Sequence, residues 1–406
     1  MSRLRLLHVT PYIVESARFG GIPTAVRTMC EALAKDGHSV TVWASDAGRE
    51  DLPLAPLEAT EIRIKLHATR FKALSRTLNS PIVPTLMKVS SDTLSGFDVV
   101  HLHGYWVTFA PFFARACLKA HKPLVLQPHG SLVESNQRML FKKVFQLMFR
   151  SLLIKATNTA IALSPAEEKQ LRRNGFPASR VTTIPNASPI APSEMPTADE
   201  ARDALKLPRG SKIVLYLGRL HKSKGLNELL KAHRAITEIT PDSVLVIAGP
   251  DEGVREELVG LANSLGLRNV RFLGAVDPRE KWVVLRAADV FCLPSAFEGV
   301  PMTVLEAAEA GVAIVLSNKV AIPGFEDGQS IVSSKPTAAS LTTSISRLFR
   351  DPELRLRIAQ GARTVSLERF APEVISSQLK EVYDKAIRGS PSVNRHDREG
   401  WSVDGP

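Results

Sequence analysis

Short apolar segments of strand length alternate with helical patterns along the chain, and the alternation runs twice. In the first half, the apolar segments cover residues 4–9, 39–44, 98–102, 124–127 and 159–163, with helical patterns such as 24–36 and 109–120. In the second half, they cover residues 212–217, 243–248, 270–272, 290–293 and 313–316, with helical patterns over 227–237, 255–265, 278–287 and 302–310. Strands that alternate with helices form parallel sheets covered on both faces. The sequence therefore predicts an α/β protein with two doubly wound, Rossmann-like domains, whose strand ends face a common cleft.

The chain of 406 residues is long enough for two domains. Residues 185–208 are rich in proline, alanine and serine, which is the composition of a linker. We therefore expect an N-terminal domain over residues 1–186 and a C-terminal domain over 187–365. A helical pattern over 366–388, interrupted at Phe370-Ala-Pro, is expected to cross back to the N-terminal domain, and the polar tail over 389–406 is expected to be disordered.

The composition is that of an ordinary globular protein, with 44% hydrophobic and 23% charged residues. No segment approaches the roughly 18 consecutive apolar residues that span a membrane. The short apolar stretch at the N-terminus contains His8 and Pro11, and we interpret it as a strand rather than a signal peptide. Cys30, Cys117 and Cys292 are far apart, which favours a reducing cytoplasm over a disulfide framework or a metal site.

The positive charge is confined to one half of the chain. The first 186 residues contain 24 Lys and Arg against 13 Asp and Glu, whereas the remainder contains 28 of each, so the first half carries the whole net charge of +11. Such asymmetry indicates an anionic partner, either nucleic acid or a membrane surface. Because no nucleic-acid-binding module accompanies the charge, a membrane surface is the better interpretation.

Residues 138–155 mix basic and large apolar residues at helical spacing and contain no acidic residue. This composition is typical of a helix that lies on an anionic membrane surface. It is equally compatible with a buried helix whose lysine side chains reach the rim.

Two glutamates in residues 295–311 form the most informative motif. Glu298 lies in a turn that contains glycine and proline, and Glu306 lies eight positions later in a helical pattern. A helix that begins near Pro301 leaves unpaired N–H groups at its N-terminus, where the helix dipole also favours phosphate. The two carboxylates could then bind sugar hydroxyls around that phosphate. Taken alone, the pattern also fits an amphipathic helix with two solvated glutamates.

Three other loops of the second half follow predicted strands. Arg219 and Lys224 lie after residues 212–217, where two cations could bind a diphosphate, although a solvated basic loop has the same composition. Gly249 begins a turn that suits close approach of a base or ribose. Val276 follows the strand at 270–272, whose backbone could contact a nucleobase.

The first half contains a Gly20-Gly21 turn after the first strand. It resembles a phosphate-binding loop, but it lacks the spacing of a dinucleotide fingerprint and a Walker lysine. Three histidines, His101, His103 and His129, lie at predicted strand ends. A metal site needs three or four converging ligands, and nothing in these spacings requires one.

We interpret His101 as a core histidine. His103 and His129 are interpreted as residues at the starts of loops that face the cleft. Tyr105 and Trp106 follow His103 after Gly104, and together with the two cleft histidines they are candidates for binding an acceptor.

Together these segments resemble the family 4 glycosyltransferases, the glycosyl transferases group 1, which are retaining enzymes of the GT-B fold. The matching elements span most of the chain: Gly20-Gly21-Ile22, Pro128-His129-Gly130-Ser131, Ile184-Pro185-Asn186, Gly218-Arg219…Lys224-Gly225 and Glu298-x7-Glu306. The chain departs from the family pattern after Asn186, where Ala-Ser replaces Gly-Val-Asp, and after the Glu helix, where Ala-Gly-Val-Ala-Ile replaces Gly-Xaa-Pro-Val.

The resemblance implies that the N-terminal domain binds the acceptor and the C-terminal domain a nucleotide-diphosphate sugar. Arg219 and Lys224 would contact the diphosphate, Glu306 the ribose and Glu298 the transferred sugar. The rest of the implied donor site comprises Gly20, Gly21, Gly249, Val276, Gly299, Met302 and Thr303. His129 would lie near the reacting sugar and its acceptor, so that the catalytic set is His129, Arg219, Lys224 and Glu298.

The family needs no cofactor or metal, because cationic side chains and helix dipoles stabilise the leaving diphosphate. The expected activity is retaining transfer of a hexose to a glycan or lipid-linked acceptor in polysaccharide, surface-glycan or exopolysaccharide biosynthesis. The expected location is the cytoplasm, peripheral to the inner face of the membrane. Two alternatives stay open, a nucleotide-sugar epimerase of the same fold and a non-catalytic glycan-assembly scaffold. The intact set of two cations and two acids argues against loss of activity. Nucleic acid is not an expected partner.

Overall fold

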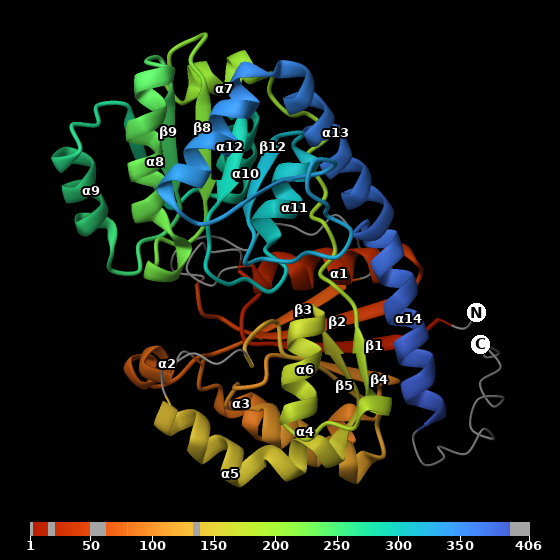
Figure 1. The fold of residues 1–406 in the computed structure, drawn as a ribbon. Helices are drawn as coiled ribbons and strands as arrows, with labels where there is room; N and C mark the ends of the chain where they lie inside the picture. The colour runs from red at the N-terminus through yellow and green to blue at the C-terminus, as the bar shows by residue number, and fades with distance from the viewer. Residues whose placement is uncertain (1–2, 15–20, 49–61, 79, 133–138, 390–406) are drawn as a thin grey trace.

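The computed structural model describes residues 3–14, 21–48, 62–78, 80–132 and 139–389. Two parallel sheets, one from each half of the chain, form two domains (Figure 1). The predicted α/β fold with two Rossmann-like domains is confirmed.

All pairings in the first sheet are parallel, and the strand order is β3-β2-β1-β4-β5-β6-β7. Its strands are β1 Arg5–Thr10, β2 Ser39–Ser45, β3 Ile62–His67, β4 Val99–His103, β5 Leu124–Gln127, β6 Thr157–Ala162 and β7 Val181–Thr183. The order reverses between β1 and β4, and a parallel sheet binds ligands beyond the carboxyl ends of its strands at such a point.

The second sheet is also parallel, with the order β10-β9-β8-β11-β12-β13. Its strands are β8 Ile213–Leu217, β9 Val244–Ala248, β10 Val270–Gly274, β11 Val290–Leu293, β12 Ala313–Ser317 and β13 Val332–Ser334. The reversal falls between β8 and β11, so both domains share one topology and one expected position for a ligand.

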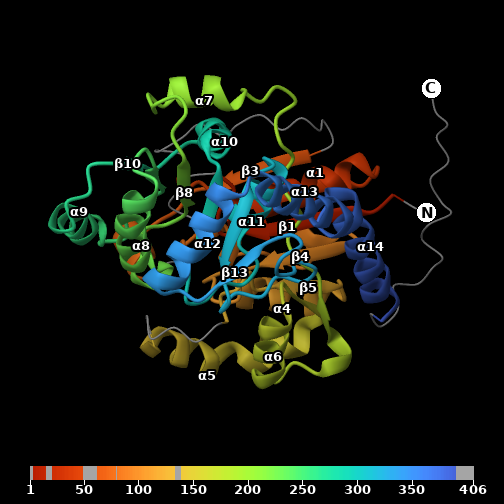
Figure 2. The ribbon, with the colours of Figure 1, turned by 45° about the horizontal axis from the view of Figure 1, so that its top comes forward.

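Helices cover the sheets, and the colours of Figures 1 and 2 separate those of the first half from those of the second. In the first half they are α1 Ile22–Lys35, α2 Lys72–Leu78, α3 Pro84–Met87, α4 Ala110–Ala120, α5 Met139–Ala156 and α6 Pro165–Arg173. In the second half they are α7 Ala198–Ala204, α8 Leu226–Ile239, α9 Arg255–Ser264, α10 Pro278–Ala287, α11 Met302–Glu309, α12 Ala338–Arg350, α13 Pro352–Arg369 and α14 Pro372–Arg388. None of the helices in the described residues combines the length and the apolar content that crossing a bilayer requires.

The central strands are buried on both faces, which explains their continuous apolar sequences. Each predicted strand is present with its ends displaced by at most two residues. Three strands, β3 and the short β7 and β13, were not predicted. In β3 the apolar residues do not form a continuous run, because Arg63 and Lys65 are exposed between Ile62, Ile64 and Leu66. Such charged positions are typical of a strand at the edge of a sheet.

Residues 185–208, whose composition is that of a linker, also contain the helix α7, which was not predicted. Thr197 and Glu200 form a capping box at its N-terminus, in which each side chain accepts a hydrogen bond from the backbone N–H of the other residue. A capping box allows a helix of seven residues to form between proline-rich flanks. The composition of residues 185–208 reflects those flanks and does not reveal the helix.

Residues 366–388 comprise the end of α13 followed by α14, with the predicted interruption at Phe370-Ala-Pro between them. The break falls at Phe370 and Ala371, because Pro372 lacks the N–H that would continue the first helix and suits the start of the next. The helix α14 packs on the first sheet and on α1 (Figure 1), and its Tyr383 belongs to the N-terminal core. The Ser188 N–H donates to the Phe370 carbonyl at 2.6 Å, so the two connections between the domains lie side by side.

Candidate active site

A cavity of about 1000 Å³ lies between the two domains, beyond the carboxyl ends of both sheets. The N-terminal domain contributes the loops that follow β1, β4 and β5. The C-terminal domain contributes the loops that follow β8, β9, β10 and β11, together with the start of α11. The position is the one expected from the two topological reversals.

Most of the residues selected from the sequence line this single cavity. They are Gly21, Tyr105, Trp106, His129, Arg219, Lys224, Gly249, Val276, Glu298, Gly299, Met302, Thr303 and Glu306. Gly20 lies outside the described residues. His103 does not line the cavity. The two cations and two acids of the motifs therefore converge on one space, although they come from two separate segments of the sequence, residues 219–224 and 298–306.

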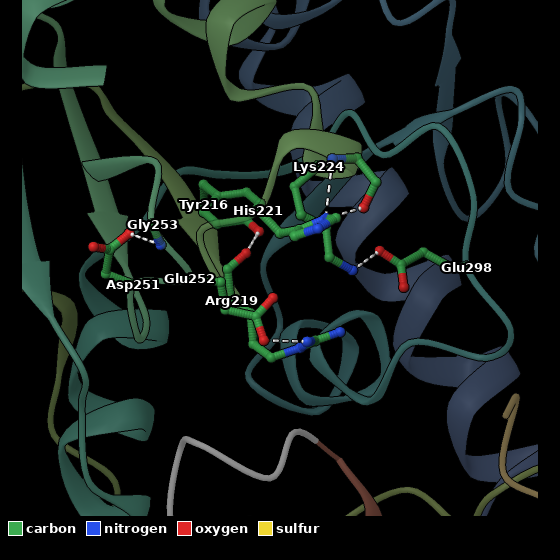
Figure 3. A network of polar contacts seen from close by, with 9 residues as sticks. Tyr216, Arg219, His221, Lys224, Asp251, Glu252, Gly253 and Glu298 are labelled. Atoms are coloured by element: carbon green, nitrogen blue, oxygen red, sulfur yellow. Dashed lines mark hydrogen bonds and ion pairs between the residues drawn. The ribbon is translucent and has the colours of Figure 1, made fainter. Parts of the chain in front are cut away.

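Lys224 forms an ion pair with Glu298 between its Nζ and the Oε1 (Figure 3). Both side chains are largely buried, with 13% and 14% of their area exposed. Lys224 ends a short 3₁₀ turn, and Gly225 follows it with a φ of 70°. A Cβ at Gly225 would lie 2.3 Å from the Pro294 carbonyl oxygen, so only glycine allows the lysine loop to approach the loop that carries Glu298.

Arg219 also has an acidic partner, which motif reading did not identify. Its guanidinium pairs with Glu252, in the loop after β9 (Figure 3). The Tyr216 hydroxyl donates to the Arg219 carbonyl at 2.7 Å and so fixes the loop after β8. At the base of these two loops, a Cβ on Gly249 would lie 1.9 Å from the Gly218 carbonyl oxygen. The glycine identified in the sequence thus serves the packing of two loops that carry cavity residues.

Glu306 is nearly inaccessible, at 2% of its area, and pairs with Lys281 of α10. Lys281 Nζ donates to Oε1 at 2.6 Å, whereas Oε2 has no partner among the described residues. Lys281 lines the cavity as well. Sequence reasoning missed this lysine because one cation in an exposed-looking helix gives no signal until the fold places it beside the acid.

The first turn of α11 borders the cavity. Pro301 is the N-cap residue and Met302 is the first residue of the helix. The first backbone hydrogen bond of the helix is donated by the Val304 N–H to the Pro301 carbonyl. The N–H groups of Met302 and Thr303 precede that bond, and both residues line the cavity. An anion is favoured at such a helix start by the N–H donors and by the dipole.

His129 occupies an unusual turn after β5. Its φ is 56°, and that of Gly130 is 74°. The buried Glu167 holds this turn, because its carboxylate accepts hydrogen bonds from the N–H groups of Gly130 and Leu163. Burial raises the pKa of Glu167. Burial also lowers the pKa of His129 to about 4, so the imidazole is neutral at pH 7.

Asn186 lies close to His129 and also lines the cavity. Its Oδ1 is buried and has no partner among the described residues. The residue belongs to the Ile-Pro-Asn segment singled out in the sequence, but it was not selected as a site residue. The signal that could have found it is that segment's place at the end of the N-terminal domain.

The placement of His103 at the cleft is wrong. It is the last residue of β4 and is completely buried, beneath His129 rather than beside it. The interpretation of His101 as a core histidine is confirmed, since it is buried and its Nδ1 lies 2.8 Å from the Tyr383 hydroxyl. The alternation of side chains along a strand explains why both rings are buried, because residues 101 and 103 point to the same face of the sheet.

Tyr105 and Trp106 form part of the N-terminal wall. Tyr105 is completely buried, its pKa is raised to about 12 by burial, and its ring meets that of Trp106 edge-on at 4.7 Å. Trp106 is half-buried, and its Nε1–H donates to the Ser131 carbonyl at 2.8 Å. The indole, rather than the phenol, is therefore the accessible aromatic group of this wall.

Comparison with known proteins places this geometry in a family. Residues 197–365 match the model described as Glycosyl transferases group 1, and residues 20–187 match the Glycosyl transferase 4-like domain. The phosphatidyl-myo-inositol mannosyltransferase of Mycobacterium leprae is 30% identical over 401 residues, which cover 96% of this chain and 99% of the relative. The D-inositol 3-phosphate glycosyltransferase of Corynebacterium urealyticum is 30% identical over 395 residues, which cover 90% of each chain.

Among solved structures, Anabaena Alr3699/HepE in complex with UDP-glucose superimposes with a TM-score of 0.73 at 20% identity, over 94% of this chain and 100% of that chain. At this identity the likeness concerns the fold. The chain belongs to the family 4 glycosyltransferases, with the GT-B fold, and is a glycosyltransferase.

Proposed function

We propose that the protein transfers a sugar from a nucleotide-diphosphate sugar to a lipid-linked acceptor at an anionic membrane surface. On the donor side, Arg219, Lys224 and the start of α11 surround a space suited to a diphosphate. Glu306 is proposed to bind the ribose hydroxyls through its unpaired Oε2. A structural neighbour supports the choice of donor, since HepE is in complex with UDP-glucose.

We propose further that the reaction retains the configuration of the sugar and needs no metal. The acceptor hydroxyl oxygen forms a bond to the anomeric carbon on the face from which the diphosphate leaves. The bond from that carbon to the phosphate oxygen breaks, and the departing phosphate takes the hydroxyl proton. Lys224 and Arg219 stabilise the negative charge that develops on the diphosphate. Glu298, which is paired with Lys224, acts on the sugar hydroxyls rather than as a nucleophile.

The helix α5 carries the proposal for the acceptor. Its first turn lines the cavity through Phe141 and Lys142, and the Lys142 Nζ lies 5.9 Å from the centre of the Trp106 ring. The same helix exposes large apolar side chains: Leu140, Val144, Leu147 and Met148. Leu147 is 89% exposed. Its exposed cations are Lys143, Arg150 and Lys155, and its sequence contains no acidic residue.

One face of α5 is therefore anchored, and the other is open. Phe145 and Leu153 pack into the N-terminal core. The alternative interpretation of residues 138–155 as a buried helix therefore holds for that face only. Exposed apolar residues flanked by cations are what an anionic lipid surface binds. Because the same helix borders the cavity, a lipid-linked acceptor on that surface would reach the N-terminal wall directly. The mannosyltransferase relative, named for phosphatidyl-myo-inositol, supports a lipid acceptor.

Cosedimentation with vesicles tests the membrane part. We expect binding to vesicles that contain anionic lipid and weak binding to neutral vesicles. Replacing Leu147 and Met148 by serine should reduce binding at least about tenfold, because each apolar side chain contributes roughly 1.5–3 kcal/mol when buried. The matched control replaces Leu356 and Leu367 of α13, which are 59% and 51% exposed, by serine. Equal loss in both double variants would contradict the assignment to α5.

A thermal-shift screen of nucleoside diphosphates and their sugars tests the donor part. A ligand at 100 times its dissociation constant should add about 2.7 kcal/mol of stability. Incubation with that donor and a lipid acceptor, followed by NMR of the product, shows whether the anomeric configuration is retained. Chelation of metals should leave the rate unchanged. Isomerised donor formed without an acceptor would instead favour the epimerase.

A further inference from the structure

A chain of three imidazole rings runs from the interior of the N-terminal sheet to the cavity. His8 Nδ1 lies 3.0 Å from His103 Nε2, and His103 Nδ1 lies 2.8 Å from His129 Nε2. His8 and His103 have no exposed area, whereas His129 lines the cavity. Three residues that are far apart in the sequence thus form one continuous hydrogen-bonded path that ends at the proposed reacting sugar.

The rings of this chain are neutral at pH 7. Burial lowers the pKa of His8 to about 3 and that of His129 to about 4, and it holds the pKa of His103 well below its ordinary value. A neutral imidazole carries one N–H and one bare nitrogen. Both hydrogen bonds can therefore form in only two arrangements: every ring carries its proton on Nδ1, or every ring carries it on Nε2.

The surroundings of His8 and His129, the two outer members of the imidazole chain, distinguish these arrangements. At the inner end, His8 Nε2 is buried and has no partner among the described residues. A buried N–H without an acceptor is rarely tolerated, so a bare nitrogen there is preferred. At the outer end, His129 Nδ1 and Asn186 Oδ1 are both buried and unpartnered within the described part of the chain, and both residues line the cavity. A proton on His129 Nδ1 suits an amide oxygen or a ligand oxygen.

We propose that His8 and His103 are positioning residues that hold His129 as the Nδ1–H tautomer, so that it presents a hydrogen-bond donor to the substrate. The inference rests on the proposed function only in placing His129 beside the transferred sugar. His103 thus acts through His129 and does not contact the acceptor itself. The donor would stabilise an oxygen of the sugar or of the leaving phosphate.

A metal site is the competing interpretation of the same cluster. Within the described residues, His8, His101 and His103 each offer a ring nitrogen, and these atoms lie within 4.8 Å of one another. However, the rings of His8 and His103 are nearly parallel, at 16°, and those of His101 and His103 are stacked at 4.2 Å. Lone pairs on stacked rings do not converge on one point, and two of the nitrogens already share a hydrogen bond.

The test follows the tautomer of His129 in protein labelled with ¹⁵N in its histidine rings. Long-range proton–nitrogen correlation spectra show which ring nitrogen carries the proton, without any substrate. We expect Nδ1–H at His129 in the wild type. In His8→Phe we expect both tautomers, with kcat reduced about tenfold, the effect of one hydrogen bond, and an unchanged KM for the donor.

The matched control is His101→Phe. His101 lies opposite His8 in the pairing of β1 with β4 and is equally buried. Its Nδ1, however, forms a hydrogen bond with the Tyr383 hydroxyl, so it is not one of the three hydrogen-bonded imidazoles. In His101→Phe we expect the tautomer of His129 and the value of kcat to match those of the wild type. If His8→Phe does not fold, His103→Asn serves instead, since its amide reaches the position of Nδ1 and lacks Nε2. There too we expect both tautomers at His129.

Three results would overturn the proposal. The first is Nε2–H at His129 in the wild type. The second is an unaltered tautomer in the His8 or His103 variant. The third is stabilisation of the wild type, but not of His8→Phe, by added Zn²⁺, which would make the cluster a metal site. Since the tautomer is read without turnover, failure of the donor or acceptor assignments leaves this test intact.

Discussion

Lys281 and Glu306 form a close ion pair in the wall of the cavity, with 2.6 Å between Nζ and Oε1, although 25 residues separate them in sequence. The exposed fractions of their side chains are 16% and 3%. The lysine binds one carboxylate oxygen, and the other has no partner among the described residues. The second glutamate of the family motif is thus fixed in orientation by a residue from a different helix.

Removal of the lysine alone should destabilise the fold. Lys281→Met leaves the Glu306 carboxylate buried without a counterion, which we expect to reduce the free energy of unfolding by about 3 kcal/mol. Lys281→Met combined with Glu306→Gln should recover most of that loss, because no unpaired charge remains. Urea denaturation of the three proteins measures both effects. Equal stability of the single and double variants would show that the pair is not buried as described.

The Glu306 and His129 variants should separate binding from catalysis. Glu306→Gln removes the charge from the proposed ribose contact, and we expect the dissociation constant of the nucleotide donor to rise about tenfold. His129→Ala should lower kcat on the order of 100-fold, with little change in donor affinity. Calorimetry and steady-state rates measure the two quantities. An unchanged donor affinity in Glu306→Gln would refute the ribose assignment.

Gly21 should tolerate no side chain in this arrangement of the domains. A Cβ there would lie 2.7 Å from Met302 Cγ, at the contact between the start of α1 and the start of α11. We expect Gly21→Ala to lower kcat/KM 10–100-fold by displacing groups across the cavity, on the order of the effect of a misplacement near 1 Å. The fold itself should be little affected, as judged by thermal unfolding.

Shortening the partner should reverse that defect. Met302→Ala removes Cγ, so Gly21→Ala with Met302→Ala should recover activity relative to Gly21→Ala alone. A double variant as inactive as the single one would place the defect in the glycine backbone rather than in the contact between domains.

The buried histidines should make the protein sensitive to acid. Burial lowers the pKa of His8 to about 3 and of His129 and His233 to about 4, whereas unfolded histidine has a pKa of 6.5. Between these values the unfolded chain binds more protons than the folded chain. The stabilisation is therefore fully present above pH 6.5 and is lost as pH falls towards 4, at up to about 1.4 kcal/mol per pH unit for each histidine.

Urea denaturation at pH 7, 6 and 5 checks this dependence. His8→Phe should reduce the slope, because one protonation difference is removed. The control is His121→Asn: His121 is exposed, and asparagine tolerates its φ of 50° at the end of α4. A slope that falls equally in both variants would contradict the assignment to the buried ring.

The architecture and most of the candidate site could be predicted from local patterns in the sequence. Strand-length apolar runs alternating with helical patterns are sufficient for two parallel sheets, because burial on both faces demands continuous apolar strands. The motif spacings place Arg219, Lys224 and Glu298 in loops after strands, and parallel strands bring such loops to one edge. The edge strand β3 and the capped helix α7 escaped because local charge and proline obscured their patterns.

The pairings between side chains could not be predicted in this way, because they depend on how the chain folds. Which carboxylate meets Arg219, which cation holds Glu306 and which ring lies behind His129 depend on contacts between loops and strands far apart in sequence. Local periodicity carries no information about such contacts. It showed that His103 ends a strand, but whether the ring faces solvent or another imidazole depends on what packs over that face, which only the folded chain determines.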